Sequence, residues 1–167
     1  MFNLFKNQFL FDEPPKVSEP FSKALLEETR RLVVKKFASK LRIYLLDSGS
    51  CNGCELELQL LFSPYFDIAS LGIEIVYEVS EADILMITGV MTQNISKEIG
   101  LLTEQFKQKK NVILMGNCPV GKAPFRNNFA LLDRGEHLFP LAYYIEGCPP
   151  EPVEILKGIH QFLKNDD

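Results

Sequence analysis

The sequence predicts an α/β domain with a mostly parallel sheet, because short apolar runs alternate with helical stretches from residue 41 onward. Several of these runs are rich in β-branched residues and do not alternate with polar ones, which is typical of strands buried on both faces. The length of 167 residues fits one such domain. We therefore expect a doubly wound sheet over residues 41–167, preceded by an N-terminal extension and an amphipathic helix over residues 1–40.

The first 40 residues have a different pattern from the rest. Phe2, Phe5 and Phe9 recur at helical spacing before Pro14 and Pro15. This stripe indicates either local packing or docking onto a partner or a membrane-embedded subunit. Residues 22–40 predict an amphipathic helix that begins acidic and ends basic, as the helix dipole favours. Its basic face indicates a solvated surface or, alternatively, contact with an anionic partner or lipid headgroups.

The remaining elements alternate as an α/β fold requires. Strands are expected at residues 43–46, 73–77, 84–88, 112–115 and 141–145. Helices are expected at residues 54–62, 95–109 and 152–163, the last with a proline near its start. Parallel strands all end at the same edge of their sheet, and in open α/β sheets this edge is where ligands bind.

Composition excludes several classes of protein. The net charge of −4 argues against a general nucleic-acid binder. No apolar run approaches the ~18–20 residues of a membrane span. The first residues lack the basic start of a secretory signal, so we expect a chain in a reducing compartment. Its four cysteines then indicate metal or redox chemistry rather than disulfides.

All four cysteines follow predicted strands. Cys51 and Cys54 come after the first strand, Cys118 after the fourth and Cys148 after the fifth. We expect them to meet at the carboxyl edge of the sheet, although 63 residues separate Cys54 from Cys118. Four convergent thiolates can bind an iron–sulfur cluster or zinc.

The surrounding residues favour the cluster. The first loop is small and glycine-rich, so we expect its amide groups to approach inorganic sulfide. Proline follows both Cys118 and Cys148, as in the Cys-Pro ending of bacterial cluster motifs. Structural zinc more often uses two short cysteine pairs. A thioredoxin-like pair is a further alternative, but it leaves Cys118 and Cys148 unexplained.

One segment is similar to a phosphate-binding loop and is rejected as such. Residues 116–122 follow a strand and end in Gly121-Lys122. However, Ala123 stands where a magnesium-binding hydroxyl is needed, and Pro119 removes an amide from the cradle.

The four cysteines lie in three distinctive segments: Asp47-Ser48-Gly49-Ser50-Cys51-Asn52-Gly53-Cys54-Glu55-Leu56-Glu57, Gly116-Asn117-Cys118 and Glu146-Gly147-Cys148-Pro149-Pro150-Glu151-Pro152. A fourth distinctive segment, Ala82-Asp83-Ile84-Leu85-Met86-Ile87-Thr88-Gly89, contains a predicted strand. In their chain order, over about residues 41–163, the four segments resemble the small subunit of membrane-bound, energy-converting [NiFe]-hydrogenases. The same fold serves the cluster-bearing connector subunit of respiratory complex I. That connector has tandem cysteines in the first loop, so the Cys-x-x-Cys spacing is similar to the hydrogenase branch. Residues 119–124 and Glu146 depart from the family pattern and indicate a divergent member.

The resemblance implies a flavodoxin-like sheet and one [4Fe–4S] cluster held by Cys51, Cys54, Cys118 and Cys148. It implies that the chain relays electrons between a ferredoxin-like iron–sulfur subunit and the active site of a hydrogenase-type large subunit. Any [NiFe] site would lie on that partner, and this chain would have no independent catalytic site. The implied location is the cytoplasmic side of the cell membrane, held by membrane-embedded subunits and without nucleic acid.

Two other functions stay open. One is the same relay in a complex I-like or nickel-free ion-pumping oxidoreductase. The other is a zinc-stabilised structural domain.

Glu57 is the candidate for a second role. It lies three residues after Cys54 and matches the acidic residue that relatives carry at that offset. We expect either a proton relay beside the cluster or a structural cap or salt bridge. Glu55, two residues earlier, is expected on a different face of the helix.

Overall fold

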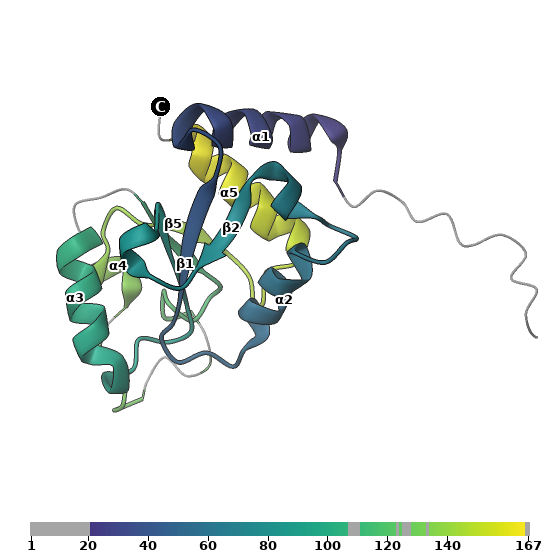
Figure 1. The fold of residues 1–167 in the computed structure, drawn as a ribbon. Coiled ribbons are helices and arrows are strands. Elements are labelled where there is room, and N and C mark those ends of the chain that lie inside the picture. Colours follow the sequence, from purple (N-terminus) through teal and green to yellow (C-terminus); the bar gives the residue numbers. More distant parts are fainter. Residues whose placement is uncertain (1–20, 107–110, 123, 125–127, 133, 166–167) are drawn as a thin grey trace, which may run out of the picture.

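The computed structural model describes residues 21–106, 111–122, 124, 128–132 and 134–165. The phenylalanine stripe of residues 1–20 lies outside these residues. Five strands form one parallel sheet in the order β2-β1-β3-β4-β5 (Figure 1). Their bounds are β1 Leu41–Asp47, β2 Ile73–Val76, β3 Ile84–Thr88, β4 Val112–Met115 and β5 Tyr143–Ile145. This is the flavodoxin-like order, so the predicted doubly wound sheet is confirmed.

The register aligns the strands across the sheet. Leu45 pairs with Met86, Met86 with Ile113, and Ile113 with Tyr143, so four strands share one row of residues. β1 also pairs with β2, beginning at Leu41 and Ile73. Because all these pairings are parallel, the segments that follow the strands emerge at one edge.

Helices cover both faces of the sheet (Figure 1). α2 and α5 lie on one face, with α1 packed across α5, and α3 and α4 lie on the other. Three short 3₁₀ helices complete the described elements. The bounds are α1 Lys23–Phe37, α2 Gly53–Leu61, η1 Ile68–Leu71, η2 Val79–Glu81, η3 Gln93–Ile95, α3 Ser96–Phe106, α4 Gly135–Leu138 and α5 Pro152–Asn165.

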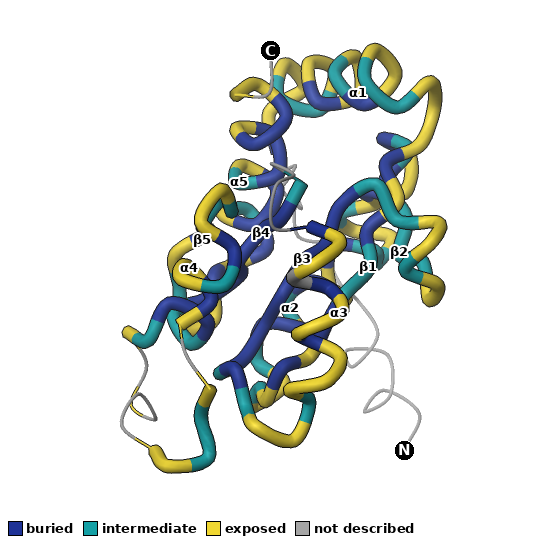
Figure 2. The backbone as a smooth tube through the Cα atoms, turned by 90° about the vertical axis from the view of Figure 1, so that its left-hand side faces the viewer, coloured by how far each residue is buried: buried dark blue, intermediate teal, exposed yellow. Residues whose placement is uncertain are grey.

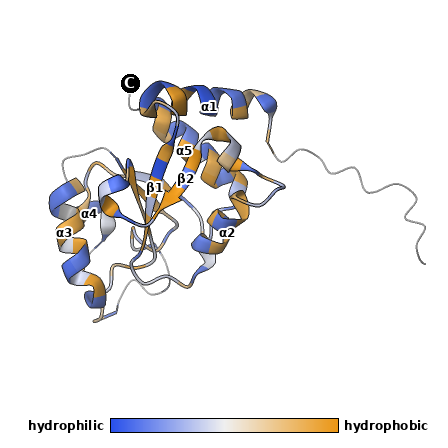
Figure 3. Cartoon of the chain, viewed as in Figure 1, coloured by the Kyte–Doolittle hydropathy of each residue, from blue (hydrophilic) through white to orange (hydrophobic). Residues whose placement is uncertain are grey.

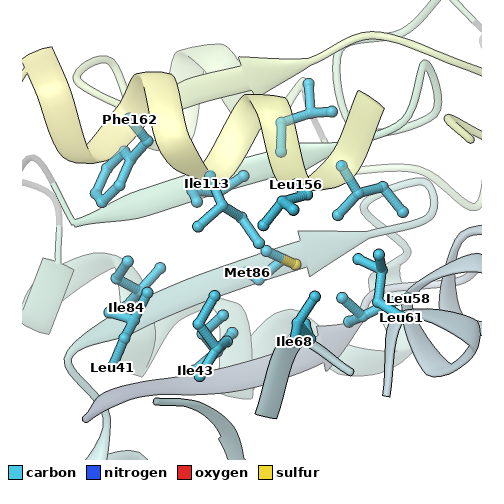
Figure 4. Packing of buried hydrophobic residues seen from close by; sticks show 14 of the residues in the cluster. Leu41, Ile43, Leu58, Leu61, Ile68, Ile84, Met86, Ile113, Leu156 and Phe162 are labelled. Carbon is cyan, nitrogen blue, oxygen red and sulfur yellow. The ribbon is translucent and has the colours of Figure 1, made fainter. Parts of the chain in front are cut away.

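The central strands send alternate side chains into two separate cores. In β3, Ile84 and Met86 pack toward α2 and α5, whereas Leu85 and Ile87 pack toward α3. Figure 4 shows the first of these cores between the sheet and the helix that carries Leu156 and Phe162. Every residue of β3 and β4 is buried, and both strands are dark blue in Figure 2. The prediction of strands covered on both faces is therefore confirmed.

α1 belongs to the same packed unit as the sheet. Ser22 caps it by accepting a hydrogen bond from the Leu25 amide at 3.3 Å, and the helix ends before Ala38, whose φ is 61°. Val33 is fully buried in the core that α5 lines. Hydrophilic and hydrophobic residues mix along α1, α3 and α5 (Figure 3), as expected for helices with one buried side.

Two local expectations differ from the structure. The last strand begins at Tyr143 rather than at residue 141, because Ala142 closes a turn by donating its amide to the Phe139 carbonyl at 3.0 Å. The single helical turn of α4 was not predicted, since four residues are too short to show helical periodicity. The helix expected to run to residue 109 is described only as far as Phe106.

α1 and α5 are joined by a buried histidine. His160 is 4% exposed, and its Nδ1 lies 2.9 Å from Thr29 Oγ1. Thr29 donates its own hydroxyl to the Leu25 carbonyl at 2.7 Å, so it can only accept from His160. Burial lowers the pKa of His160, while Glu28, whose Oε2 lies 3.5 Å from Nε2, opposes this shift.

This pKa shift predicts how stability changes with pH. Since the folded pKa of His160 lies below the unfolded value of about 6.5, the unfolded chain binds a proton more readily. The free energy of unfolding should therefore fall as the pH drops below about 6.5, by at most ~1.4 kcal/mol per pH unit from this one group. Urea unfolding at several pH values should show this slope in the wild type and a smaller one in His160→Gln. The exposed His137→Gln is the control, and an unchanged slope in His160→Gln would contradict the assignment.

Candidate functional site

Three segments at the carboxyl edge of the sheet carry the four cysteines. Cys51 lies between β1 and α2, and Cys54 is the second residue of α2. Cys118 follows β4, and Cys148 follows β5 and precedes Pro149 in a cis peptide bond. All four are free thiols. Cys54 is buried at 9% exposure, Cys118 is half-buried, and Cys51 and Cys148 are exposed. The placement of all four on one edge is as the sequence predicts.

The first loop is held mainly by its own side chains. Asp47 Oδ1 accepts the amides of Gly49 and Ser50 at 2.9 and 2.7 Å, and Ser50 Oγ accepts the amide of Asn52 at 3.0 Å. These three amides therefore have partners within the loop. The expected approach of loop amides to inorganic sulfide is therefore left to the amides that Asp47 and Ser50 do not take.

The loop is also pinned to the end of β3. Ser48 donates its amide and its hydroxyl to the Thr88 carbonyl, at 3.0 and 2.6 Å. In return, the Ser48 carbonyl accepts both the amide and the hydroxyl of Thr92, at 3.1 and 2.9 Å. The segment just before Cys51 is thus held by hydrogen bonds to the last residue of β3 and to Thr92 in the loop that follows this strand.

The thiols are close enough to influence one another. Burial, followed by Glu55 and then Cys118, Cys51 and Cys148, raises the pKa of Cys54 to about 12. The pKa of Cys118 is also raised, first by burial and then by Cys148 and Cys51. At neutral pH these two groups are protonated in the metal-free chain, so a metal centre would bind by displacing protons.

Gly116, which precedes Cys118 by two residues, leaves room for the Cys54 thiol because it has no side chain. Gly116 has φ of +88°, and a Cβ added there would lie 2.6 Å from Cys54 Sγ. Cys51 and Cys118 both line a hollow of about 270 Å³ between the loops. Four cysteine sulfurs around such an edge are the donor set of an iron–sulfur cluster, so the residues fit this group. Within the described residues, no three His, Cys, Asp or Glu side chains stand close enough to hold a single metal ion.

Residues 116–122 form a closed turn rather than a phosphate cradle. Gly121 donates its amide to the Cys118 carbonyl at 3.1 Å, and Lys122 donates its amide to the Asn117 carbonyl at 3.0 Å. The Lys122 ammonium group lies 3.4 Å from Glu146 Oε1.

The buried carboxylate beside the cysteines is Glu55 and not Glu57. Glu55 is 7% exposed, and its Oε1 accepts the Thr88 hydroxyl, which ties the first turn of α2 to β3. Its Oε2 is buried and has no hydrogen-bond partner among the described residues. Glu57 is half-buried. Helical spacing does not separate the two, because Glu55 precedes the buried Leu58 by three residues and Glu57 precedes the buried Leu61 by four. Only the position of Thr88, whose hydroxyl donates a hydrogen bond to Glu55, distinguishes the buried carboxylate from the other one.

The fold and the cysteines agree with a known family. A family model described as "NADH ubiquinone oxidoreductase, 20 Kd subunit" matches residues 51–162, which include all four cysteines. The chain belongs to this family. The resemblance inferred from the cysteine segments is therefore confirmed.

The relatives are subunits of oxidoreductase complexes. The chain is 37% identical over 122 residues to the probable membrane-bound hydrogenase subunit mbhJ of Pyrococcus furiosus, covering 70% of each chain. It is 32% identical over 131 residues to formate hydrogenlyase subunit 7 of Escherichia coli, covering 78% of this chain but only 51% of that one. It is 29% identical over 112 residues to one subunit of the NADH-quinone oxidoreductase of Phocaeicola vulgatus, covering 66% of this chain and 57% of that one.

A solved structure shares the fold. A chain of the membrane-bound sulfane sulfur reductase, an archaeal respiratory membrane complex, superposes with a TM-score of 0.60 at 24% identity, covering 83% of this chain and 75% of that one. In the part of this chain that the structure describes, no helix has the length and apolar character needed to span a membrane.

The close approach at Gly116 predicts a strong effect of one methyl group. In Gly116→Ala, the new Cβ would clash with Cys54 Sγ and the residue would keep an unfavourable positive φ. We expect unfolding in urea to become easier by more than about 1 kcal/mol in the metal-free chain. Gly100→Ala is the control, since a Cβ at this exposed helical position meets nothing within 4 Å and should stabilise α3 by about 0.5–1 kcal/mol. Equal stability of Gly116→Ala and wild type would contradict the geometry.

Proposed function

We propose that this chain is the electron-relay subunit of a membrane-associated, hydrogenase-type oxidoreductase complex, holding one [4Fe–4S] cluster through Cys51, Cys54, Cys118 and Cys148. The observation that carries the proposal is the convergence of these four thiols at one sheet edge in a chain of this family. When bound, the cluster would supply reversible one-electron chemistry. The residues of the chain would hold it, set its surroundings and leave part of it near partner subunits.

The burial of the four cysteines supports a site near the surface. Cys54 anchors the site in the core, whereas Cys51 and Cys148 are exposed. Leu56 and Leu60 lie one helical turn apart on α2, the helix that carries Cys54 in its first turn, and they are 57% and 46% exposed. An exposed apolar pair on this helix is suited to contact with another protein. We assign this face to a large partner subunit that would carry the active site.

The other partners follow from the role of a relay. A relay needs a donor as well as an acceptor, and we assign the donor to a ferredoxin-like iron–sulfur subunit. The chain has four cysteines in all, so none remains for a second cluster or for a [NiFe] site. Any [NiFe] site would lie on the large subunit. Membrane-embedded subunits would hold the chain on the cytoplasmic side of the membrane. The membrane-bound hydrogenase relative supports the association with a membrane.

The similarity to the NADH-quinone oxidoreductase relative supports a second candidate, the same relay in a complex I-like or nickel-free ion-pumping enzyme. The sequence of the neighbouring large subunit separates the two. A [NiFe] site requires two Cys-x-x-Cys pairs there, and a nickel-free enzyme lacks them.

Metal and sulfide analysis after anaerobic reconstitution tests the proposed cofactor. We expect about four irons and four sulfides per wild-type chain. Each of the four Cys→Ser variants should lose occupancy, and Cys118→Ser is the sharpest test because that residue lies outside the Cys51–Cys54 pair. A wild-type chain that holds zinc and no sulfide would be a structural domain instead. Full iron content in Cys118→Ser would remove Cys118 from the ligand set.

We further propose that Glu57 passes protons near the cluster. In Glu57→Gln the side chain keeps its shape but cannot ionise, so turnover of the assembled complex should slow at least tenfold, about 1.4 kcal/mol of barrier. Iron content and assembly should be unchanged. Glu81→Gln is the matched control, because Glu81 is exposed just before β3 at the opposite edge of the sheet. Wild-type turnover of Glu57→Gln at every pH would leave Glu57 with a structural role only.

A further inference from the structure

The loops that carry Cys118 and Cys148 are paired one residue before each cysteine. Beyond the last strand residues, Gly116 donates its amide to the Ile145 carbonyl at 2.9 Å, and Asn117 donates its amide to the Gly147 carbonyl at 2.7 Å. The side chain of Asn117 completes the pair, because its Oδ1 accepts the Gly147 amide at 3.2 Å. Asn117 and Gly147 therefore bind each other in both directions.

A second donor fixes the same oxygen of Asn117. The Tyr144 hydroxyl lies 2.5 Å from Asn117 Oδ1. Because the Gly147 amide can only donate, the atom facing it must be the amide oxygen, and Tyr144 must then donate as well. Burial and two nearby glutamates raise the pKa of Tyr144 to about 12, so its hydroxyl keeps its proton at physiological pH.

The Cys118 loop closes onto the same group of residues. The Asn117 carbonyl accepts the Lys122 amide at 3.0 Å, which folds residues 118–121 into a tight turn. The Lys122 ammonium group lies 4.8 Å from the centre of the Tyr144 ring and reaches Glu146. These contacts lie within and between the segments that follow β4 and β5. None of these hydrogen bonds involves the Cys51–Cys54 loop, which Asp47 and Ser48 hold.

We propose that Asn117 is a positioning residue that sets the separation of Cys118 and Cys148 before any cluster binds. This rests on the proposed function, and it gives each half of the site its own set of hydrogen bonds, although the two halves touch where Gly116 approaches Cys54. A ligand pair whose backbone is already paired loses less conformational entropy on binding and releases the metal centre more slowly. Removing the Asn117 side chain leaves the Gly147 amide and the Tyr144 hydroxyl without their shared acceptor.

The experiment compares cluster retention in four variants of the reconstituted chain. After anaerobic loading, iron release to an excess of chelator is followed by the loss of cluster absorbance. Asn117→Ala should release iron roughly tenfold faster than wild type or more. Tyr144→Phe, which removes one of the two donors and keeps the ring, should fall between them. Asn111→Ala is the control at the other end of β4, where Asn111 bonds the Asp83 carbonyl, and Tyr143→Phe is the control in the same strand as Tyr144. Both controls should release iron at the wild-type rate.

Hydrogen exchange of the Gly147 amide in the metal-free chain provides a second measurement. The amide should be protected in wild type and exchange faster in Asn117→Ala. Wild-type release rates in both Asn117→Ala and Tyr144→Phe, or an unprotected Gly147 amide in wild type, would overturn the proposal. If Asn117→Ala does not fold, Tyr144→Phe against Tyr143→Phe decides alone. Failure of the wild-type chain to take up any cluster is seen before the variants are compared, and it would count against the proposed function rather than against the pairing.

Discussion

The shared direction of the strands is the constraint on which the site depends. β1, β4 and β5 all end at one edge of the sheet, and a cysteine follows each of them by three or four residues. A slip of two residues in one strand would move its cysteine by about 6.6 Å along the sheet. That distance is nearly three times a metal–thiolate bond of about 2.3 Å. The two cores that fix the register, one on each face, therefore also fix the geometry of the cysteines.

The same burial that fixes the register also disfavours the thiolate form of Cys54 and Cys118 in the metal-free chain, because it raises the pKa of both groups. Cys54 is the most buried of the four, and both its burial and the neighbouring Glu55 hold its proton on. The Glu55 carboxylate is itself enclosed, with one oxygen on Thr88 and the other without a partner among the described residues. A metal centre that binds at this edge would therefore have to displace the protons that burial holds on Cys54 and Cys118. Its binding should weaken as the pH falls, because the thiols then keep their protons more firmly.

The sequence predicts the fold and the cysteines far better than it predicts what surrounds them. The strands of the centre are identified because their apolar runs are continuous, and the cysteines are placed because each follows such a run. That Glu55 and not Glu57 is the buried carboxylate could not be predicted, since both lie at helical spacing from buried leucines and only Thr88, 33 residues from Glu55, distinguishes them. The pairing of Asn117 with Gly147 was likewise hidden, because it joins positions 30 residues apart that become neighbours only when β4 and β5 pair. What sequence patterns miss here are contacts between segments that are far apart in the chain.

The four cysteines differ in how deeply they are buried, so the site has a buried side and an exposed side. Cys54, in the first turn of α2, faces the core, Cys118 is half-buried, and Cys51 and Cys148 are exposed. Glu55 and Thr88 lie with Cys54 on the buried side. Leu56 and Leu60 of α2 are exposed, as are Cys51 and Cys148. The proposed relay of electrons would need a rigid interior wall and an open face, and this sheet edge supplies the wall from its strand ends and the open face from its loops.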